Sequence, residues 1–99
     1  MITGPQCRAA RALIELSRDR LAQFSGVDAE IIEYFERKLD TPSSEVITAL
    51  QDALEKAGAQ FIGENGGGPG VRLKFNRSET KRIANMENEG GIAAFDDVP

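Results

Sequence analysis

The chain has 99 residues, of which 12 are lysine or arginine and 16 are aspartate or glutamate, so its net charge is −4. This length allows one small domain with a modest core, and the acidic balance argues against nucleic-acid binding through bulk charge, which requires cations that neutralise phosphates. No apolar run is long enough for a membrane span, and residues 1–4 are too few for a signal peptide. The single cysteine, Cys7, excludes an internal disulfide and fits a reducing cytoplasm.

A first helix is predicted near the start of the chain. Pro5 stands where the first turn of a helix tolerates proline, and the stretch from Cys7 to Leu16 follows with apolar residues at helical spacing. Cys7 lies on the same pattern in a chain without histidine, so we interpret it as a small buried residue rather than a redox centre or metal ligand. The expected core residues of this helix are Ala10, Leu13, Ile14 and Leu16.

Two short helices joined by a tight turn are predicted between Leu16 and Arg37. Ser17 can cap the first of them, and Gly26 can end it, because glycine tolerates the positive φ of a helix end. Asp28 can cap the second, with Val27 sealing the corner, which is the pattern of a helix-turn-helix. The residues expected to face inward are Leu21, Ala22 and Phe24 in the first helix and Ile31, Ile32 and Phe35 in the second.

This stretch also matches a family pattern, S-Q-x-x-L-A-x-x-x-G-V-S-x-x-T-I-x-x-x-E-x-G. The matching residues are Ser17, Leu21, Ala22, Gly26, Val27, Ile32 and Glu36. On these residues the chain resembles the lambda-repressor-like (XRE) family of bacterial transcriptional regulators, from residue 7 to about residue 58. The resemblance implies a four-helix helix-turn-helix domain over 5–58. It also implies a structural ion pair between Arg11 and Glu36, because the family commonly pairs an arginine there with the glutamate that closes the recognition helix.

A fourth helix and a β-hairpin follow. Asp40, Thr41 and Pro42 break the chain, and a helix is expected from about Ser43 to Ala57, ended by Gly58. Its expected buried stripe is Val46, Leu50, Ala53, Leu54 and Ala57. Strands are expected at 59–63 and 71–75, because apolar residues alternate in the second, with a glycine-rich loop between them. No G-K-[ST] follows the glycines, so we interpret them as a hairpin loop rather than a phosphate cradle. The hairpin must pack on the helices or pair through its free edge with a second copy, as a homodimer.

The remaining residues, 76–99, form an acidic tail that lacks any cation beyond residue 84. Such a segment buries too little apolar surface to offset its ordering entropy, so we expect a flexible tail. Its spaced apolar residues also suit a second contact with a partner, and these are Ile92, Phe95 and Val98. The predicted fold class is therefore mainly α: a four-helix helix-turn-helix domain (5–58), a β-hairpin extension (59–75) and a disordered tail (76–99).

The outward face of the predicted recognition helix is unusual for the family. Its residues are Asp28, Ala29, Glu30, Glu33 and Arg37, where the family usually has Ser, Thr, Arg, Gln, Asn or Lys. A carboxylate about 4 Å from a phosphate costs roughly 1 kcal/mol even in a water-like dielectric. Asp28 and Glu30 have a structural explanation, since acids stabilise a helix N-terminus, but Glu33 does not. Arg18 and Arg20 could recover part of the lost attraction to phosphates.

Two functions remain open. The first is a protein-binding regulator that uses this acidic face, and the tail as a second contact, to inhibit another transcription factor, as small antiactivators of quorum-sensing and mobile-element systems do. The second is a dimeric DNA-binding repressor that reads an operator with Asp28, Ala29, Glu30 and Glu33 while Arg18 and Arg20 hold phosphates. The charge on the docking face favours the first. With no histidine, a cysteine without a base and no metal-ligand spacing, we expect no enzyme, cofactor, metal or small-molecule substrate.

Overall fold

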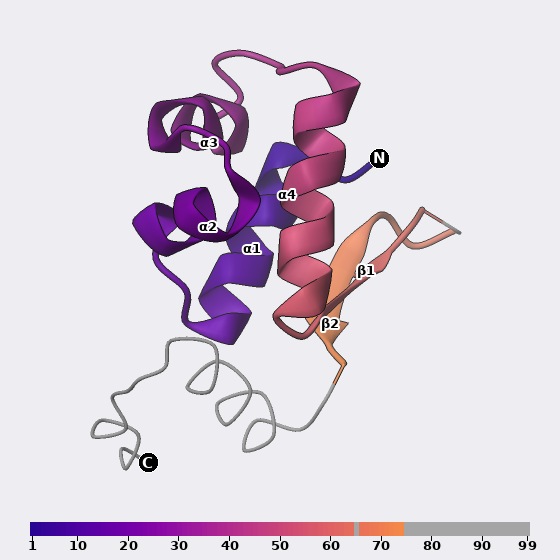
Figure 1. Cartoon of the computed structure of the whole chain (residues 1–99). Coiled ribbons are helices and arrows are strands. Elements are labelled where there is room, and N and C mark those ends of the chain that lie inside the picture. Colours follow the sequence, from indigo (N-terminus) through magenta and orange to yellow (C-terminus); the bar gives the residue numbers. More distant parts are fainter. Residues whose placement is uncertain (65, 75–99) are drawn as a thin grey trace, which may run out of the picture.

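The computed structural model describes residues 1–64 and 66–74, and the tail predictions, including Ile92, Phe95 and Val98, lie outside them. This part of the chain is mainly helical, with four helices followed by a two-stranded antiparallel hairpin. Helices α2 (Arg18–Ser25) and α3 (Ala29–Glu36) lie on one side of α1 (Gly4–Ile14) and α4 (Ser44–Lys56), and the hairpin lies on the other (Figure 1). Among these residues no helix is both long and apolar enough to cross a membrane.

Helix α1 spans Gly4–Ile14, so it begins one residue before Pro5, the predicted first helical position, and ends two residues before Leu16. Thr3 caps it: the threonine side chain accepts a hydrogen bond from the Gln6 amide, and the Gln6 side chain accepts one from the Thr3 amide. This reciprocal capping box satisfies two amide donors of the first turn, which explains the earlier start. At the other end Glu15 adopts the left-handed conformation, with φ of 62°, and closes the helix.

Helices α2 (Arg18–Ser25) and α3 (Ala29–Glu36) have the predicted boundaries. The Ser17 hydroxyl accepts a hydrogen bond from the Arg20 amide at 3.0 Å, and Gly26 ends α2 with φ of 78°. Asp28 precedes α3, but its side chain makes no capping hydrogen bond, which corrects the predicted cap. Its carboxylate is exposed at the positive end of the helix dipole, where an acid is stabilising without a direct bond.

Helix α4 spans Ser44–Lys56, and the Ser43 hydroxyl caps it by accepting from the Val46 amide at 3.3 Å. Strands β1 (Ala59–Ile62) and β2 (Gly70–Leu73) then pair antiparallel, with Ala59 opposite Leu73 and Ile62 opposite Gly70.

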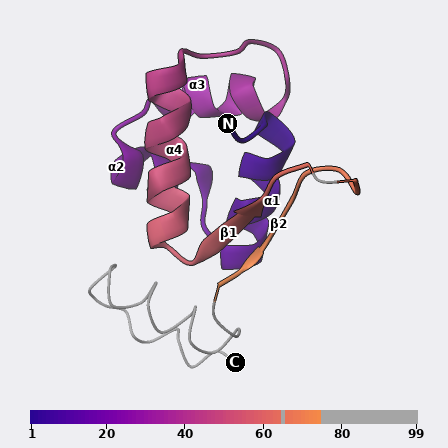
Figure 2. The same cartoon turned by 90° about the vertical axis from the view of Figure 1, so that its right-hand side faces the viewer.

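The hairpin rests on the helices, with β1 beside α1 and α4 and β2 beside α1 (Figure 2). The Gln6 side-chain amide donates to the Ile62 carbonyl at 3.3 Å and to the Gly70 carbonyl at 2.8 Å. One buried amide therefore joins the N-terminus of α1 to both strands, which supplies the support that an isolated hairpin lacks.

The core lies between the four helices and the base of the hairpin. Its fully buried side chains include Cys7, Ala10, Leu21, Ile32, Leu50 and Leu54. Ile47 belongs to this core and was absent from the predicted stripe of α4. The buried residues of α4, Ile47, Leu50 and Leu54, are spaced i, i+3 and i+7, so Val46 falls beside the stripe and is only partly buried.

Two predicted core residues are exposed. Leu13 is 43% exposed, because the buried stripe of α1 runs through Cys7, Ala10 and Ile14. Ile31 is 41% exposed, because it lies about 100° around α3 from Ile32. Phe24, Ala22, Leu16 and Ala53 are partly rather than fully buried.

Gly4 marks the closest approach of two helices. A Cβ atom at this position would overlap the carbonyl group of Phe35 in α3. We expect Gly4→Ala to lower the free energy of unfolding by about 1–3 kcal/mol, because α1 would have to move away from α3. Gly63→Ala is the control, since its Cβ would meet no atom within 4 Å and should change stability by less than about 1 kcal/mol. Urea unfolding of both variants measures the difference, and equal stabilities would contradict this close approach.

Candidate functional site

A buried carboxylate holds α3 in place. The Glu36 side chain is fully buried, and Arg11 contacts it with two hydrogen bonds: Nε to Oε2 and Nη2 to Oε1, each 2.8 Å. The ion pair implied by the family resemblance is therefore formed. Arg18 joins it from α2, with Nη2 at 3.3 Å from Glu36 Oε1. The carboxylate thus links the first three helices.

Cys7 completes the surroundings of this carboxylate. Its thiol is fully buried and donates to Glu36 Oε2 across 3.3 Å. Burial and the neighbouring Glu36 charge raise the pKa of the Cys7 thiol far above its usual range, so it stays protonated. Burial alone would raise the pKa of Glu36, but hydrogen bonds from Arg11 and Cys7 and the arginine charges outweigh it and lower that pKa. The interpretation of Cys7 as a structural residue agrees with this environment.

The residues predicted to form the outward face of α3 lie at the surface. Asp28, Glu30 and Arg37 are exposed, whereas Ala29 and Glu33 are partly buried. Arg37 and Glu33 form an exposed ion pair one helical turn apart, with Arg37 Nη1 2.8 Å from Glu33 Oε2, so each partly offsets the charge of the other. We call Asp19, Asp28, Glu30 and Glu33 the acidic surface.

A shallow hollow of about 340 Å³ lies where α2 meets this face. It gathers Arg18, Asp19, Ala29, Glu30 and Glu33. Four of the seven predicted face residues, Arg18, Ala29, Glu30 and Glu33, are therefore neighbours, while Arg20, Asp28 and Arg37 lie outside the hollow's lining.

The two arginines assigned to phosphates under the DNA alternative have partners within the chain. Arg18 binds the buried Glu36 and keeps only 33% of its side chain exposed. Arg20 lies over the Phe24 ring, 5.2 Å from its centroid, and donates to Gln23 at 3.2 Å. Each contact offsets part of the arginine's charge and uses one of its nitrogen atoms, which leaves fewer donors for a phosphate, and sequence reasoning missed both contacts. For the contact between Arg18 and Glu36 the sequence contains one indirect indication. The expected ion pair of Arg11 with Glu36 implies that Glu36 faces inward.

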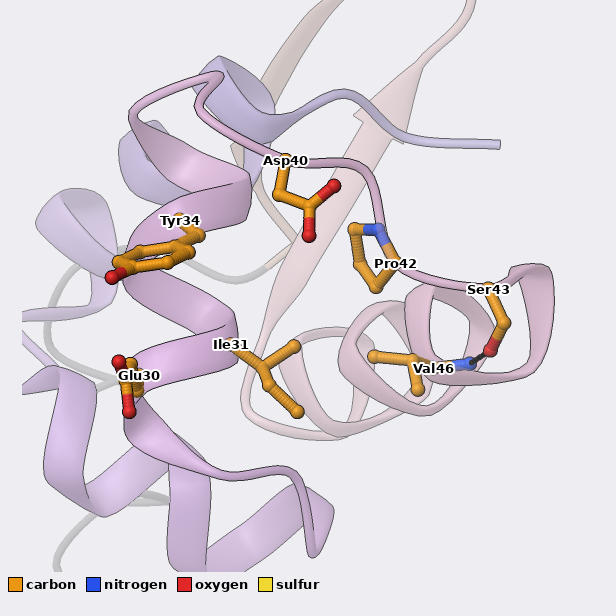
Figure 3. Close-up of a pocket in the computed structure, with 7 residues that line it drawn as sticks. All are labelled: Glu30, Ile31, Tyr34, Asp40, Pro42, Ser43 and Val46. Carbon is orange, nitrogen blue, oxygen red and sulfur yellow. Dashed lines mark hydrogen bonds between the residues drawn. The ribbon is translucent and has the colours of Figure 1, made fainter.

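A second cavity, of about 330 Å³, opens between α3 and the start of α4 (Figure 3). Ile31 from α3 and Val46 from α4 point toward one another across it, beside Pro42. Tyr34 on α3 is a further lining residue, and its ring extends away from Ile31 and Val46 in Figure 3. The carboxylates that line it belong to Glu30 and Asp40; its remaining lining residue is Ser43. We call this the α3–α4 cleft. Sequence reasoning missed it because Ile31 was assigned to the core, although Ile31 and Tyr34 are three residues apart and share a helix face.

Among residues 1–64 and 66–74, no three His, Cys, Asp or Glu side chains are grouped closely enough to hold a metal ion. No protein-family model matches the chain, and no curated protein matches its sequence.

Replacing the buried carboxylate should be costly. We expect Glu36→Gln to lower the free energy of unfolding by about 3 kcal/mol, because Arg11 and Arg18 would lose their counter-charge in a largely buried setting. The matched control is Glu33→Gln, which removes an exposed i,i+4 pair and should cost less than about 0.5 kcal/mol. Urea unfolding at neutral pH measures both, and equal costs would contradict a central role for Glu36.

The same carboxylate should make stability depend on pH. Because the pKa of Glu36 is lower in the folded chain, its stabilising contribution is complete above the unfolded pKa and is lost as pH falls through the folded pKa. The stability difference between wild type and Glu36→Gln should therefore shrink progressively as pH falls below about 5, where the carboxyl group of the unfolded chain begins to bind a proton. Urea midpoints recorded across this range test the effect, and a constant or growing difference would contradict it.

Proposed function

We propose that this chain is a cytoplasmic regulatory protein with an XRE-type, lambda-repressor-like helix-turn-helix domain that binds another transcription factor and inhibits it. In this proposal α2 and α3 form the helix-turn-helix, and the acidic surface on them contacts a cationic region of the target. Inhibition follows from occlusion, because the covered region of the target can no longer reach DNA or its own regulatory partner.

The observation that carries this proposal is the charge that remains available around α3. Asp28 and Glu30 are exposed, while Arg18 is engaged by Glu36 and Arg37 by Glu33. DNA affinity depends on several unopposed cation–phosphate contacts, and each carboxylate near a phosphate costs roughly 1 kcal/mol or more. A cationic protein surface meets the same carboxylates with attraction, which also speeds association.

DNA binding is the first test. Fluorescence anisotropy with labelled mixed-sequence duplexes at about 50 mM salt should show no saturable binding up to about 10 μM chain, because the acidic surface repels phosphates. Submicromolar binding with a steep loss of affinity on adding salt would overturn the proposal in favour of a DNA-binding repressor.

Charge reversal on the acidic surface is the second test of the proposed function. Affinity capture on the full chain followed by mass spectrometry identifies a transcription factor, which is then purified and assayed for promoter binding with the chain added. The chain should inhibit promoter binding, and Glu30→Arg with Glu33→Arg should weaken inhibition at least about tenfold, since attraction becomes repulsion. The control is Asp52→Arg with Glu64→Arg, which reverses two exposed acids in α4 and the hairpin loop. Inhibition unchanged by the first pair would exclude the acidic surface as the contact.

A further inference from the structure

The α3–α4 cleft combines two features that the acidic surface alone does not have. Its walls are apolar and belong to two different helices and the turn between them: Ile31 and Tyr34, Pro42, and Val46. Ile31 and Tyr34 are each 41% exposed although both are large and apolar. Exposed apolar residues that line a concavity mark a binding surface more clearly than scattered ones.

The charges around this cleft are of one sign. Glu30 on α3 and Asp40 in the segment before Pro42 both line it (Figure 3), and the lining residues include no lysine or arginine. Both carboxylates are at exposed residues, and Asp40 is further held in place because its Oδ1 accepts a hydrogen bond from the Thr41 amide at 2.9 Å. An occupant that matches this cleft is therefore apolar in the middle and positively charged on both sides.

We propose that the α3–α4 cleft receives one large aliphatic or aromatic side chain from a cationic amphipathic helix of the partner, with flanking lysine or arginine residues on Glu30 and Asp40. The apolar side chain gains from leaving water, and the flanking charges select partners of the right sign. This inference rests on the proposed function, since it names the chemistry of the segment that the regulator would bind beside its acidic surface.

The charge pattern also disfavours other occupants. In a symmetric dimer the same patch meets itself, so a second copy would bring its own Glu30 and Asp40 toward these two carboxylates, and like charges would repel. Duplex DNA would bring phosphates toward the same carboxylates, and the cleft offers an apolar wall where a phosphate needs donors.

A defined peptide can probe the cleft. The probe is a blocked 14-residue helical peptide with leucine along one face and lysine or arginine elsewhere. Titrated into the full, isotope-labelled chain, it should shift the backbone amide signals of Ile31, Tyr34 and Val46 first. Two control peptides separate the apolar contribution to binding from the electrostatic one. In the first the leucines are replaced by serine, and in the second the lysine and arginine residues are replaced by glutamate. Both should bind at least about tenfold more weakly.

Matched variants of the chain complete the test. Ile31→Asp should weaken peptide binding at least about tenfold, because it places a charge on the apolar wall. Leu13→Asp is the control, since Leu13 is exposed to the same extent, 43% against 41%, but lies on α1. Far-ultraviolet circular dichroism and urea unfolding show whether both variants remain folded. If Ile31→Asp does not fold, Tyr34→Ser replaces it as the cleft variant.

Several outcomes would overturn this inference. The serine peptide could bind as tightly as the leucine peptide, or the Ile31→Asp variant could bind the peptide as tightly as the wild-type chain. The amide shifts could also be centred away from the cleft. Finally, the chain could self-associate in a way that Ile31→Asp abolishes. Its failure is distinguishable from failure of the proposed function. If charge reversal at Glu30 and Glu33 abolishes inhibition while Ile31→Asp does not, the cleft is excluded and the acidic surface stands. If the peptide binds in the cleft but the chain inhibits no transcription factor, the cleft stands as a binding site for a cationic amphipathic helix and the proposed function is excluded.

Discussion

The arrangement of the first three helices depends on one buried carboxylate. Taking Glu36 out of water is costly by itself, and the cost is offset because Arg11, Arg18 and Cys7 all donate to its two oxygens. Since these donors come from α1 and α2, the carboxylate can be satisfied only when both helices stand in one position relative to α3. This requirement makes the interaction a source of structural specificity as much as of stability.

The same interaction decides what α3 presents to solvent. With Glu36, Phe35 and Ile32 turned inward, Glu30 lies on the opposite side of α3, and Ile31 lies at the border of the buried stripe with 41% of its surface exposed. Arg18, which lines the hollow beside the acidic surface, also contacts the buried Glu36, so part of its charge is directed toward the interior. The charge of the outer face is thus a consequence of how the inner face is held, and both follow from the order of residues along α3.

Local rules were sufficient for most of the fold. Ser17, Ser43 and Gly26 act on the backbone within three or four residues of themselves, so the helix boundaries they set could be predicted from the sequence. The mainly helical class and the hairpin followed from periodicity in the same way. Gln6 could not be predicted as the support of the hairpin, because the carbonyls it binds are 56 and 64 residues away in the sequence.

The candidate site was predicted only in part. The acidic residues of α3 were identified because an outward position follows from the spacing of the inward ones. The assignments of Ile31 and Leu13 failed because each stands at the border of an apolar stripe, where the position of a neighbouring helix decides whether the side chain is covered. The engagement of Arg18 depends on how three helices meet, which periodicity along one helix does not report.

The buried position of Cys7 makes its thiol a probe for the separation of α1 from α3. The sequence contains one cysteine, and its thiol is sealed between α1 and α3 and kept in the unreactive protonated form. A thiol-directed label can therefore reach it only when these helices separate, and the labelling rate then counts separation events. Any ligand that tightens the contact between α1 and α3 will slow the label, so the strength of an interaction at the surface can be followed from an atom in the core.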